Sequence, residues 1–236
     1  MKKLFIAMVS MFLLSACSEA STTSMKPPTP IITESTGSTT TDKSTVELSS
    51  PTPTSNTIQI TGPLTLSRND LFQYTNKHEY LSVVLISGKY FEDWTPSPFM
   101  GRNWVGEFQI QLSNESGEVT SAFDLNGFST GDIVFNSFFN IEFDDYNGDG
   151  NIDFTIGQYA SSNGDVFKLF TLDQTGRIKD LPIKGYPDIF VSGTGRYSTK
   201  LTKTKLGFSC SYYDNSIGKD VKQSFVWNGK EFVSDK

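Results

Sequence analysis

Apolar side chains at every second position constrain the fold of this chain more than any other feature. Phe108, Ile110 and Leu112 alternate with two glutamines, and the polar run 114–117 then turns the chain back. The same alternation recurs near residues 119–123, 139–143, 154–156, 166–172 and 225–233. Successive side chains of a strand point to opposite faces, so this period predicts β-strands, and the short polar spacers predict antiparallel hairpins. The expected fold class is all-β.

Turn and cap signals fit the same prediction. Asn228-Gly229 separates two apolar segments and predicts a hairpin, because both residues tolerate a positive φ. The segment 173–176 is interpreted as an ordinary hairpin turn. Ser67 followed by Asp70 resembles a capping box and predicts a helix. The expected architecture is a series of antiparallel hairpins with one short helix.

The first sixteen residues have the parts of a secretory signal peptide. Lys2 and Lys3 precede an uncharged apolar run over residues 4–14, and small residues lead up to Cys17. An apolar helix of this length spans about 16 Å, whereas the hydrocarbon layer of a membrane is about 30 Å thick. We therefore expect residues 1–16 to be a cleaved signal peptide and not a permanent transmembrane helix.

The end of this segment carries a short and specific motif. Leu14-Ser15-Ala16-Cys17 resembles the lipobox of bacterial lipoproteins, whose cysteine receives a diacylglycerol before the signal peptide is cut. The resemblance implies a lipid anchor on Cys17 and a location on the extracytoplasmic face of the cell membrane. More than one acyl chain gives lasting attachment, since a single chain holds only marginally.

A composition shift divides the remaining chain into two parts. Residues 17–57 are dominated by serine, threonine and proline, and they contain too little apolar surface to offset the entropy of ordering. We expect a flexible tether with a reach of roughly 35 Å. Aromatic residues and turn signals begin together at Ile58, so residues 58–236 are predicted to form a single all-β domain.

The net charge argues against a nucleic-acid partner, and the cysteine content argues against an intrachain disulfide. The formal charge is -6, and it becomes -8 once Lys2 and Lys3 leave, because 18 basic residues then face 26 acidic ones. An acidic surface is repelled by phosphate backbones, so no nucleic-acid partner is expected. Lipid attachment consumes Cys17 and leaves Cys210 alone, which excludes an intrachain disulfide. We expect Cys210 to be a buried strand residue.

One segment carries the composition of a metal site. Residues 145–153 read Asp-Tyr-Asn-Gly-Asp-Gly-Asn-Ile-Asp, with oxygen-bearing side chains at positions one, three, five and nine. Calcium takes six to eight oxygen ligands, and glycine at position six permits the sharp bend that brings them together. The predicted ligands are Asp145, Asn147, Asp149, Asp153 and, through its backbone carbonyl, Asn151. Position twelve holds Ile156 instead of glutamate, which argues against a helix-loop-helix site.

This segment resembles the calcium loop of the FG-GAP and VCBS families, the integrin-type propeller repeats. In those families the loop joins two strands of a blade, and the residues at positions one, three, five and nine bind the ion. The resemblance implies a calcium-stabilised, β-propeller-like domain. The loop occurs once in this chain, so a smaller related β-sheet assembly remains an alternative.

Aromatic residues gather in the least periodic part of the predicted domain. Tyr90, Trp94 and Trp104 lie around two prolines and a glycine. Exposed rings in such a loop would stack on a carbohydrate or anchor a protein ligand. Core packing accounts for the same residues.

Two functions from different classes follow. The first is a non-catalytic surface module that binds a carbohydrate or protein ligand. The alternative is an extracellular hydrolase acting on cell wall or polysaccharide, in which acidic residues such as Glu92, Asp93 and Glu107 would pair. His78 is the single histidine, no nucleophile motif accompanies it, and we expect it at the surface.

Overall fold

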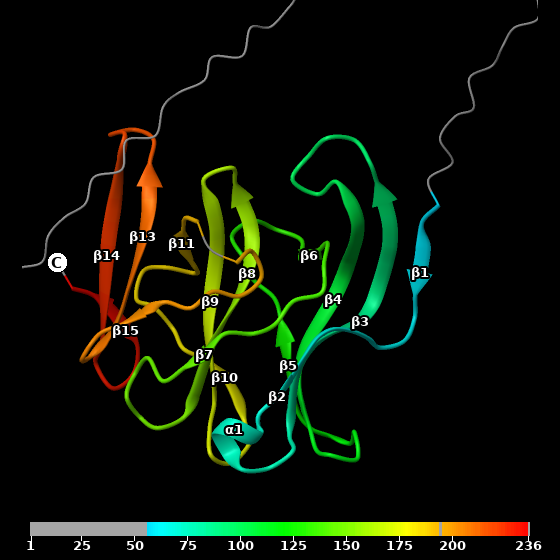
Figure 1. The fold of residues 1–236 in the computed structure, drawn as a ribbon, viewed down its shortest axis with the longest axis horizontal. Helices are drawn as coiled ribbons and strands as arrows, with labels where there is room; N and C mark the ends of the chain where they lie inside the picture. Colours follow the sequence, from blue (N-terminus) through cyan, green and yellow to red (C-terminus); the bar gives the residue numbers. More distant parts are fainter. Residues whose placement is uncertain (1–55, 194, 236) are drawn as a thin grey trace, which may run out of the picture. The chain divides into compact units, whose positions relative to one another are not determined.

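The computed structural model describes residues 56–193 and 195–235, which form fifteen strands and one helix (Figure 1). The described residues belong to one compact unit. The predicted signal peptide, Cys17 and nearly all of the predicted tether lie outside them. Within the described ranges, no helix has both the length and the apolar character needed to cross a membrane.

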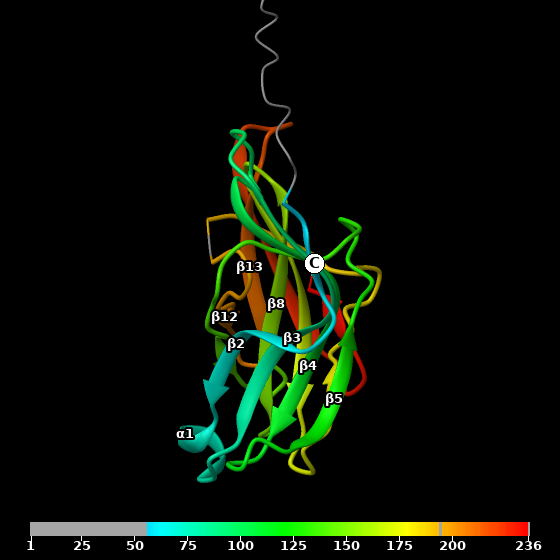
Figure 2. The ribbon, with the colours of Figure 1, turned by 90° about the vertical axis from the view of Figure 1, so that its right-hand side faces the viewer.

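The first sheet has six strands and contains the longest hairpin. Its strands are β1 (Ile58–Ile60), β2 (Leu64–Asp70), β3 (Tyr80–Asp93), β4 (Gly101–Ser113), β5 (Val119–Leu125) and β6 (Val134–Phe135). The order is β1-β3-β4-β5, with β2 also on β3 and β6 on β4. Ile58 pairs with Tyr90 near the tip of the β3–β4 hairpin. The helix α1 (Phe72–Thr75) lies at the other end of β3 (Figure 2).

The second and third sheets follow in chain order. The second contains β7 (Phe143–Asp144), β8 (Ile152–Ser161), β9 (Gly164–Leu172), β10 (Ile178–Asp180) and β11 (Ile189–Val191). The third contains β12 (Thr202–Lys203), β13 (Gly207–Asp214), β14 (Lys219–Trp227) and β15 (Phe232–Ser234). All paired strands in the three sheets are antiparallel, and each sheet is formed by one continuous stretch of the chain.

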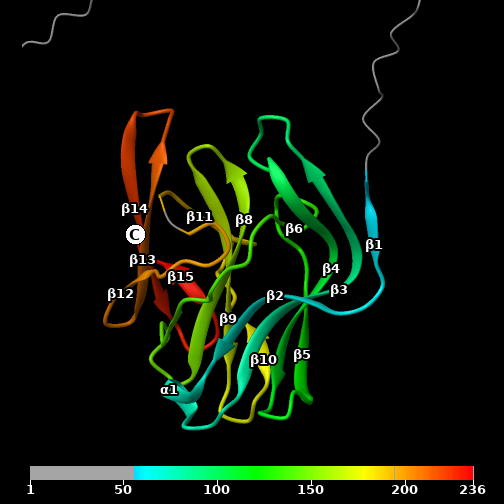
Figure 3. The same cartoon turned by 45° about the vertical axis from the view of Figure 1, so that its right-hand side comes forward.

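The second sheet is the middle layer of the described domain (Figures 1 and 3). Alternate residues of β9 serve two different cores: Phe170 and Leu172 pack with the first sheet, whereas Phe167 and Leu169 pack with the third. A strand that is apolar on both faces is buried on both faces. The stacking of three sheets therefore follows from the double alternation in residues 166–172.

The all-β, antiparallel prediction with one short helix is confirmed. The predicted capping box is wrong, because Ser67 lies in β2 and the helix begins at Phe72. Asp70 does accept a hydrogen bond from the Phe72 backbone N–H, at 2.8 Å. The resemblance to a propeller stays a prediction.

The predicted strand over residues 139–143 is reduced to Phe143–Asp144. Side chains of other segments take the backbone donors that a strand would use. The N–H of Ile141 donates to Asn69 Oδ1 and that of Glu142 to Ser198 Oγ, each at 2.9 Å. The segment is therefore a connection fastened between sheets.

The hairpin predicted at Asn228-Gly229 is present, but its turn differs from the prediction. Trp227 pairs with Phe232, so four residues connect the strands instead of two. Gly229 has a φ of 95°, while Asn228 keeps a negative φ. The Asn228 side-chain oxygen accepts the N–H groups of Lys230 and Glu231, both at 3.0 Å.

Cys210 is a buried residue of β13, as predicted from its strand pattern. Burial raises the pKa of its thiol to about 11, because the charged thiolate is poorly solvated between the second and third sheets. This cysteine therefore has a packing role.

Candidate functional site

The predicted calcium loop connects β7 to β8 in the middle sheet. Asp144 pairs with Asp153 at its base, so the loop begins and ends on adjacent strands. Gly148 and Gly150 have φ values of 74° and 79°, which let the chain reverse tightly. The five predicted ligand residues consequently lie in or directly beside one short turn.

Backbone N–H groups converge on the first carboxylate of the loop. Asp145 Oδ1 accepts hydrogen bonds from Gly148 at 2.8 Å and Asp149 at 3.1 Å, and Oδ2 accepts one from Gly150 at 3.3 Å. Asp149 Oδ1 in turn accepts the Asn151 N–H at 2.9 Å. The loop is thus wrapped around its own acidic side chains.

Asp153 is the most unusual residue of the loop because its side chain is fully buried. Its Oδ2 atom accepts the N–H groups of Tyr146 at 2.8 Å and Asn147 at 3.3 Å. Its Oδ1 atom is buried without any hydrogen-bond partner among the described residues. Desolvation raises the pKa of this carboxyl to about 6. A buried carboxylate oxygen without a partner is costly, and a cation would compensate it.

Thr171 faces Asp153 across the β8–β9 ladder. The Thr171 side chain, acting as a hydrogen-bond donor, lowers the pKa of Asp153 by less than burial raises it. This contact is a poor hydrogen bond, because within the described residues neither the Thr171 hydroxyl nor Asp153 Oδ1 has a partner at good geometry. Two neighbouring buried oxygens at the base of the loop are therefore poorly satisfied.

The other predicted ligands lie nearer the surface. The Asn147 amide donates to Asp149 Oδ2 at 2.9 Å, and the Asn151 side-chain oxygen accepts the N–H of Gln174 at 3.2 Å. Within the described ranges, no three carboxylate, imidazole or thiol side chains are already arranged as a metal site. The donor types fit calcium, and the outer carboxylates would have to turn from backbone donors to the ion.

Two lysines supply positive charge beside the loop. Lys203 Nζ lies 3.6 Å from Asp144 Oδ1 and 3.7 Å from Asp145 Oδ2, and Lys200 Nζ lies 3.6 Å from Asp144 Oδ2. These side chains are partly exposed, so each pair contributes about 0–1 kcal/mol. Among the described residues, the ion pairs of both lysines are with Asp144 and Asp145, and neither lysine pairs with the buried oxygen of Asp153.

The aromatic residues predicted as ligand contacts separate into different environments. Trp94 is 65% exposed at the tip of the β3–β4 hairpin. Trp104 is a core residue, only 7% exposed, whose ring packs against half-buried Tyr90 and exposed Phe138, so its prediction as a ligand-binding ring is wrong. Tyr90 is half-buried, and its hydroxyl donates to Glu92. Its ring pairs with Trp104 across the ladder, which leaves Trp94 as the one exposed ring of the three.

The acids considered for a hydrolase are surface groups of the β3–β4 hairpin. Hydrogen bonds from Tyr90 and Trp94 lower the pKa of Glu92, and the Thr95 N–H lowers that of Asp93. Glu107 accepts a hydrogen bond from Ser87 at 2.9 Å. A lowered pKa is the opposite of what a general acid needs. His78 is exposed as predicted, with Nδ1 3.2 Å from Asp70 Oδ2.

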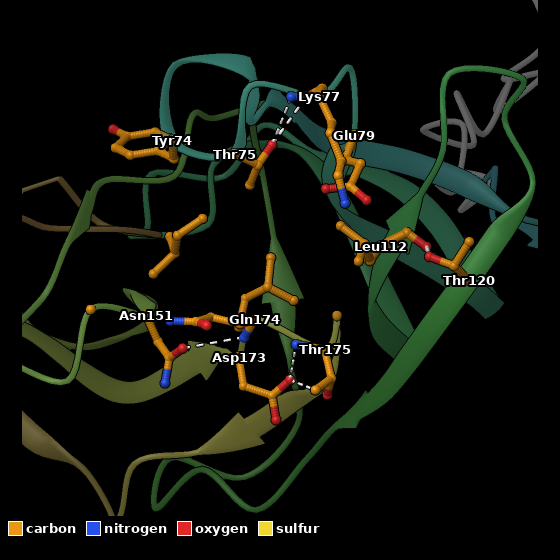
Figure 4. Close-up of a pocket in the computed structure, with 14 residues that line it drawn as sticks. Tyr74, Thr75, Lys77, Glu79, Leu112, Thr120, Asn151, Asp173, Gln174 and Thr175 are labelled. Atoms are coloured by element: carbon orange, nitrogen blue, oxygen red, sulfur yellow. Dashed lines mark hydrogen bonds between the residues drawn. The ribbon is translucent and has the colours of Figure 1, made fainter.

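A pocket that the sequence did not predict adjoins the calcium loop. It has a volume of about 500 Å³ and lies between the first and second sheets, at the α1 end (Figure 4). Four separate segments form it: the end of α1 with the chain after it, the β4–β5 hairpin, the end of the predicted calcium loop and the β9–β10 turn. No local motif joins these segments, so no sequence signal could have found the pocket.

Comparisons with known protein families, with curated proteins and with solved structures find no match to this chain. The case for a function therefore depends on the residues and contacts of the molecule itself.

Proposed function

We propose that this protein is a lipid-anchored lipoprotein, displayed on the outer face of a cell membrane, whose β domain is a calcium-stabilised, non-catalytic binding module. The observation that carries the calcium assignment is the unpartnered Oδ1 atom of Asp153, buried at the base of the loop. A cation in the loop would compensate this oxygen and the two nearby acids, Asp145 and Asp149. Calcium suits the all-oxygen donor set.

Calcium is expected to stabilise the domain without taking part in chemistry. Extracellular calcium sites commonly bind at about 0.1 to 1 mM. At about 1 mM free calcium and an affinity near 0.1 mM, mass action adds roughly 1.4 kcal/mol to the free energy of unfolding. For a domain of this size we expect the melting temperature to fall by about 4 °C when a chelator replaces calcium.

Asp149→Ala provides the test of this stabilisation. We expect the variant to lose the difference in melting temperature between calcium and chelator, because it lacks one ligand. The matched control is Asp132→Ala, which removes an exposed acid outside the loop and should keep the full difference. Calorimetry of both variants measures the effect. A wild-type melting temperature that does not respond to calcium would remove calcium from the proposed function.

The anchor is tested separately at Cys17. Cys17→Ser removes the thiol that would carry the lipid, so we expect the variant to move from the detergent phase to the aqueous phase on phase partition. Mass spectrometry of the wild-type N-terminus should find two or more acyl chains. Wild-type protein that partitions into water, with residues 1–16 still attached, would contradict the anchored assignment.

The alternative is an extracellular hydrolase acting on cell wall or polysaccharide. Such an enzyme needs a carboxyl group of raised pKa facing a cleft. Asp153 has a raised pKa but is fully buried, whereas the ion pair with Lys179 lowers the pKa of Asp173, which lines the pocket. These environments favour the non-catalytic module.

A further inference from the structure

The pocket beside the calcium loop has polar groups on facing walls. Lys77 and Glu79 lie on one side, and Asn151 and Gln174 lie on the other (Figure 4). Among the described residues, no hydrogen bond or ion pair occupies the Lys77 amine, the Glu79 carboxylate, the Gln174 side-chain amide or the Asn151 amide nitrogen. Donors and acceptors are therefore both available to a ligand.

Apolar side chains complete the lining. Leu112 and Leu172 are buried and Ile152 is half-buried, and all three line the pocket. Tyr74 is 43% exposed at its edge, where its ring packs against Phe143. A small-ligand site typically combines an apolar lining with a few convergent polar groups, within a volume of about 300 to 1,000 Å³.

The charges of the lining nearly cancel. Lys77 opposes Glu79, and Asp173 is already neutralised by Lys179 Nζ at 2.6 Å. A strongly charged ligand would be repelled by Lys77 or by Glu79, whichever carries a charge of the same sign. A neutral molecule with many hydroxyl groups and an apolar C–H face matches amides, one carboxylate and aliphatic side chains together.

One wall of the pocket belongs to the calcium loop. Gly150 and Asn151 line the pocket, and their backbone N–H groups donate to Asp145 and Asp149, the acids assigned to the ion. The Asn151 side chain is also bonded to the N–H of Gln174 on the opposite turn. Turning these acids toward an ion would reposition the wall that carries Asn151.

We propose that this pocket binds a short neutral saccharide and that bound calcium sets its affinity. The inference rests on the proposed function and deepens it, because it gives the binding module a site and a ligand class. It also moves the ligand site from the hairpin tip that carries Trp94 to the opposite end of the first sheet.

The test is an NMR titration of the ¹⁵N-labelled mature chain, held in a detergent without a sugar head group. With triglycine as the peptide comparison, the probes are maltotriose, cellotriose and triacetylchitotriose, each added with calcium and again with chelator. We expect one of them to give saturable shifts in the side-chain amides of Asn151 and Gln174 and in the backbone amides of Gly150 and Gly176. Chelation should weaken the affinity at least about five-fold.

Two variants localise the effect. Gln174→Ala removes a free amide of the pocket and should weaken binding about five-fold. Gln223→Ala on β14 removes the same group from the third sheet and should leave the affinity unchanged. Melting curves of both variants show whether each is folded.

Each of the other outcomes decides either the saccharide site or its coupling to calcium. Absence of saturable shifts with all three trisaccharides overturns the saccharide site, and so do shifts with triglycine alone, which would assign the pocket to peptides. Equal affinity with calcium and chelator overturns the coupling. If calcium raises the melting temperature while no trisaccharide binds, this inference fails and the calcium-stabilised module stands.

Discussion

Asp153→Asn is expected to abolish the calcium response while leaving the domain folded. An asparagine oxygen can still accept the backbone N–H of Tyr146, and its amide nitrogen would face the unsatisfied hydroxyl of Thr171. With chelator, we expect its free energy of unfolding to lie within about 1 kcal/mol of wild type, because a hydrogen-bonded neutral group replaces a desolvated one. With calcium, the gain of roughly 1.4 kcal/mol should be missing.

Asp153→Ala separates this role from simple packing. Alanine leaves the N–H groups of Tyr146 and Asn147 without their acceptor inside the domain. We expect a loss of about 3 kcal/mol in chelator, because each unsatisfied buried donor costs about 1–3 kcal/mol. Urea unfolding of both variants measures the difference. An Asp153→Asn protein that keeps the full calcium increment would show that this carboxylate is not a ligand.

Replacing Tyr146 with alanine is expected to lower the free energy of unfolding by about 4 kcal/mol. The ring is 1% exposed and packs against Phe208 of the third sheet, with ring centroids 5.8 Å apart. Its hydroxyl accepts the buried Leu201 N–H at 3.0 Å, and burial raises its pKa to about 12, so the group stays neutral. Tyr146 therefore ties the calcium loop to the third sheet.

Tyr146→Phe removes only the acceptor and should cost about 1–2 kcal/mol. Tyr213→Ala is the control, since that ring is 42% exposed and should change stability by less than about 0.5 kcal/mol. Guanidinium unfolding followed by tryptophan fluorescence compares the three variants. If Tyr146→Ala is no more damaging than Tyr213→Ala, the loop does not depend on the third sheet for its shape.

The sequence indicated the strands because alternation is a local property. The segment 166–172 even carried the double alternation of a strand with two buried faces. The segment 139–143 shows where this reasoning fails. Its apolar residues alternate, yet side chains of Asn69 and Ser198, remote in the sequence, take its backbone donors.

The candidate site divides in the same way. The candidate ligands could be named in advance because nine consecutive residues contain them, and their binding of calcium stays a prediction. The burial of Asp153 was not predictable, since it depends on packing between the second and third sheets. The assignment of Trp104 failed for a related reason. The sequence shows that the residue is a tryptophan, but its burial depends on packing with distant segments. The pocket was not predictable either, because four segments that are remote in the sequence form it.

The pairing of Ile58 with Tyr90 has a consequence for how the module is presented. The pocket lies near Tyr80, at the other end of β3, about ten residues or roughly 33 Å away. The described domain therefore begins beside one end of β3, and the pocket opens beside the other end. A bulky polymer bound in the pocket would keep the length of β3 between itself and the residues at which the domain begins.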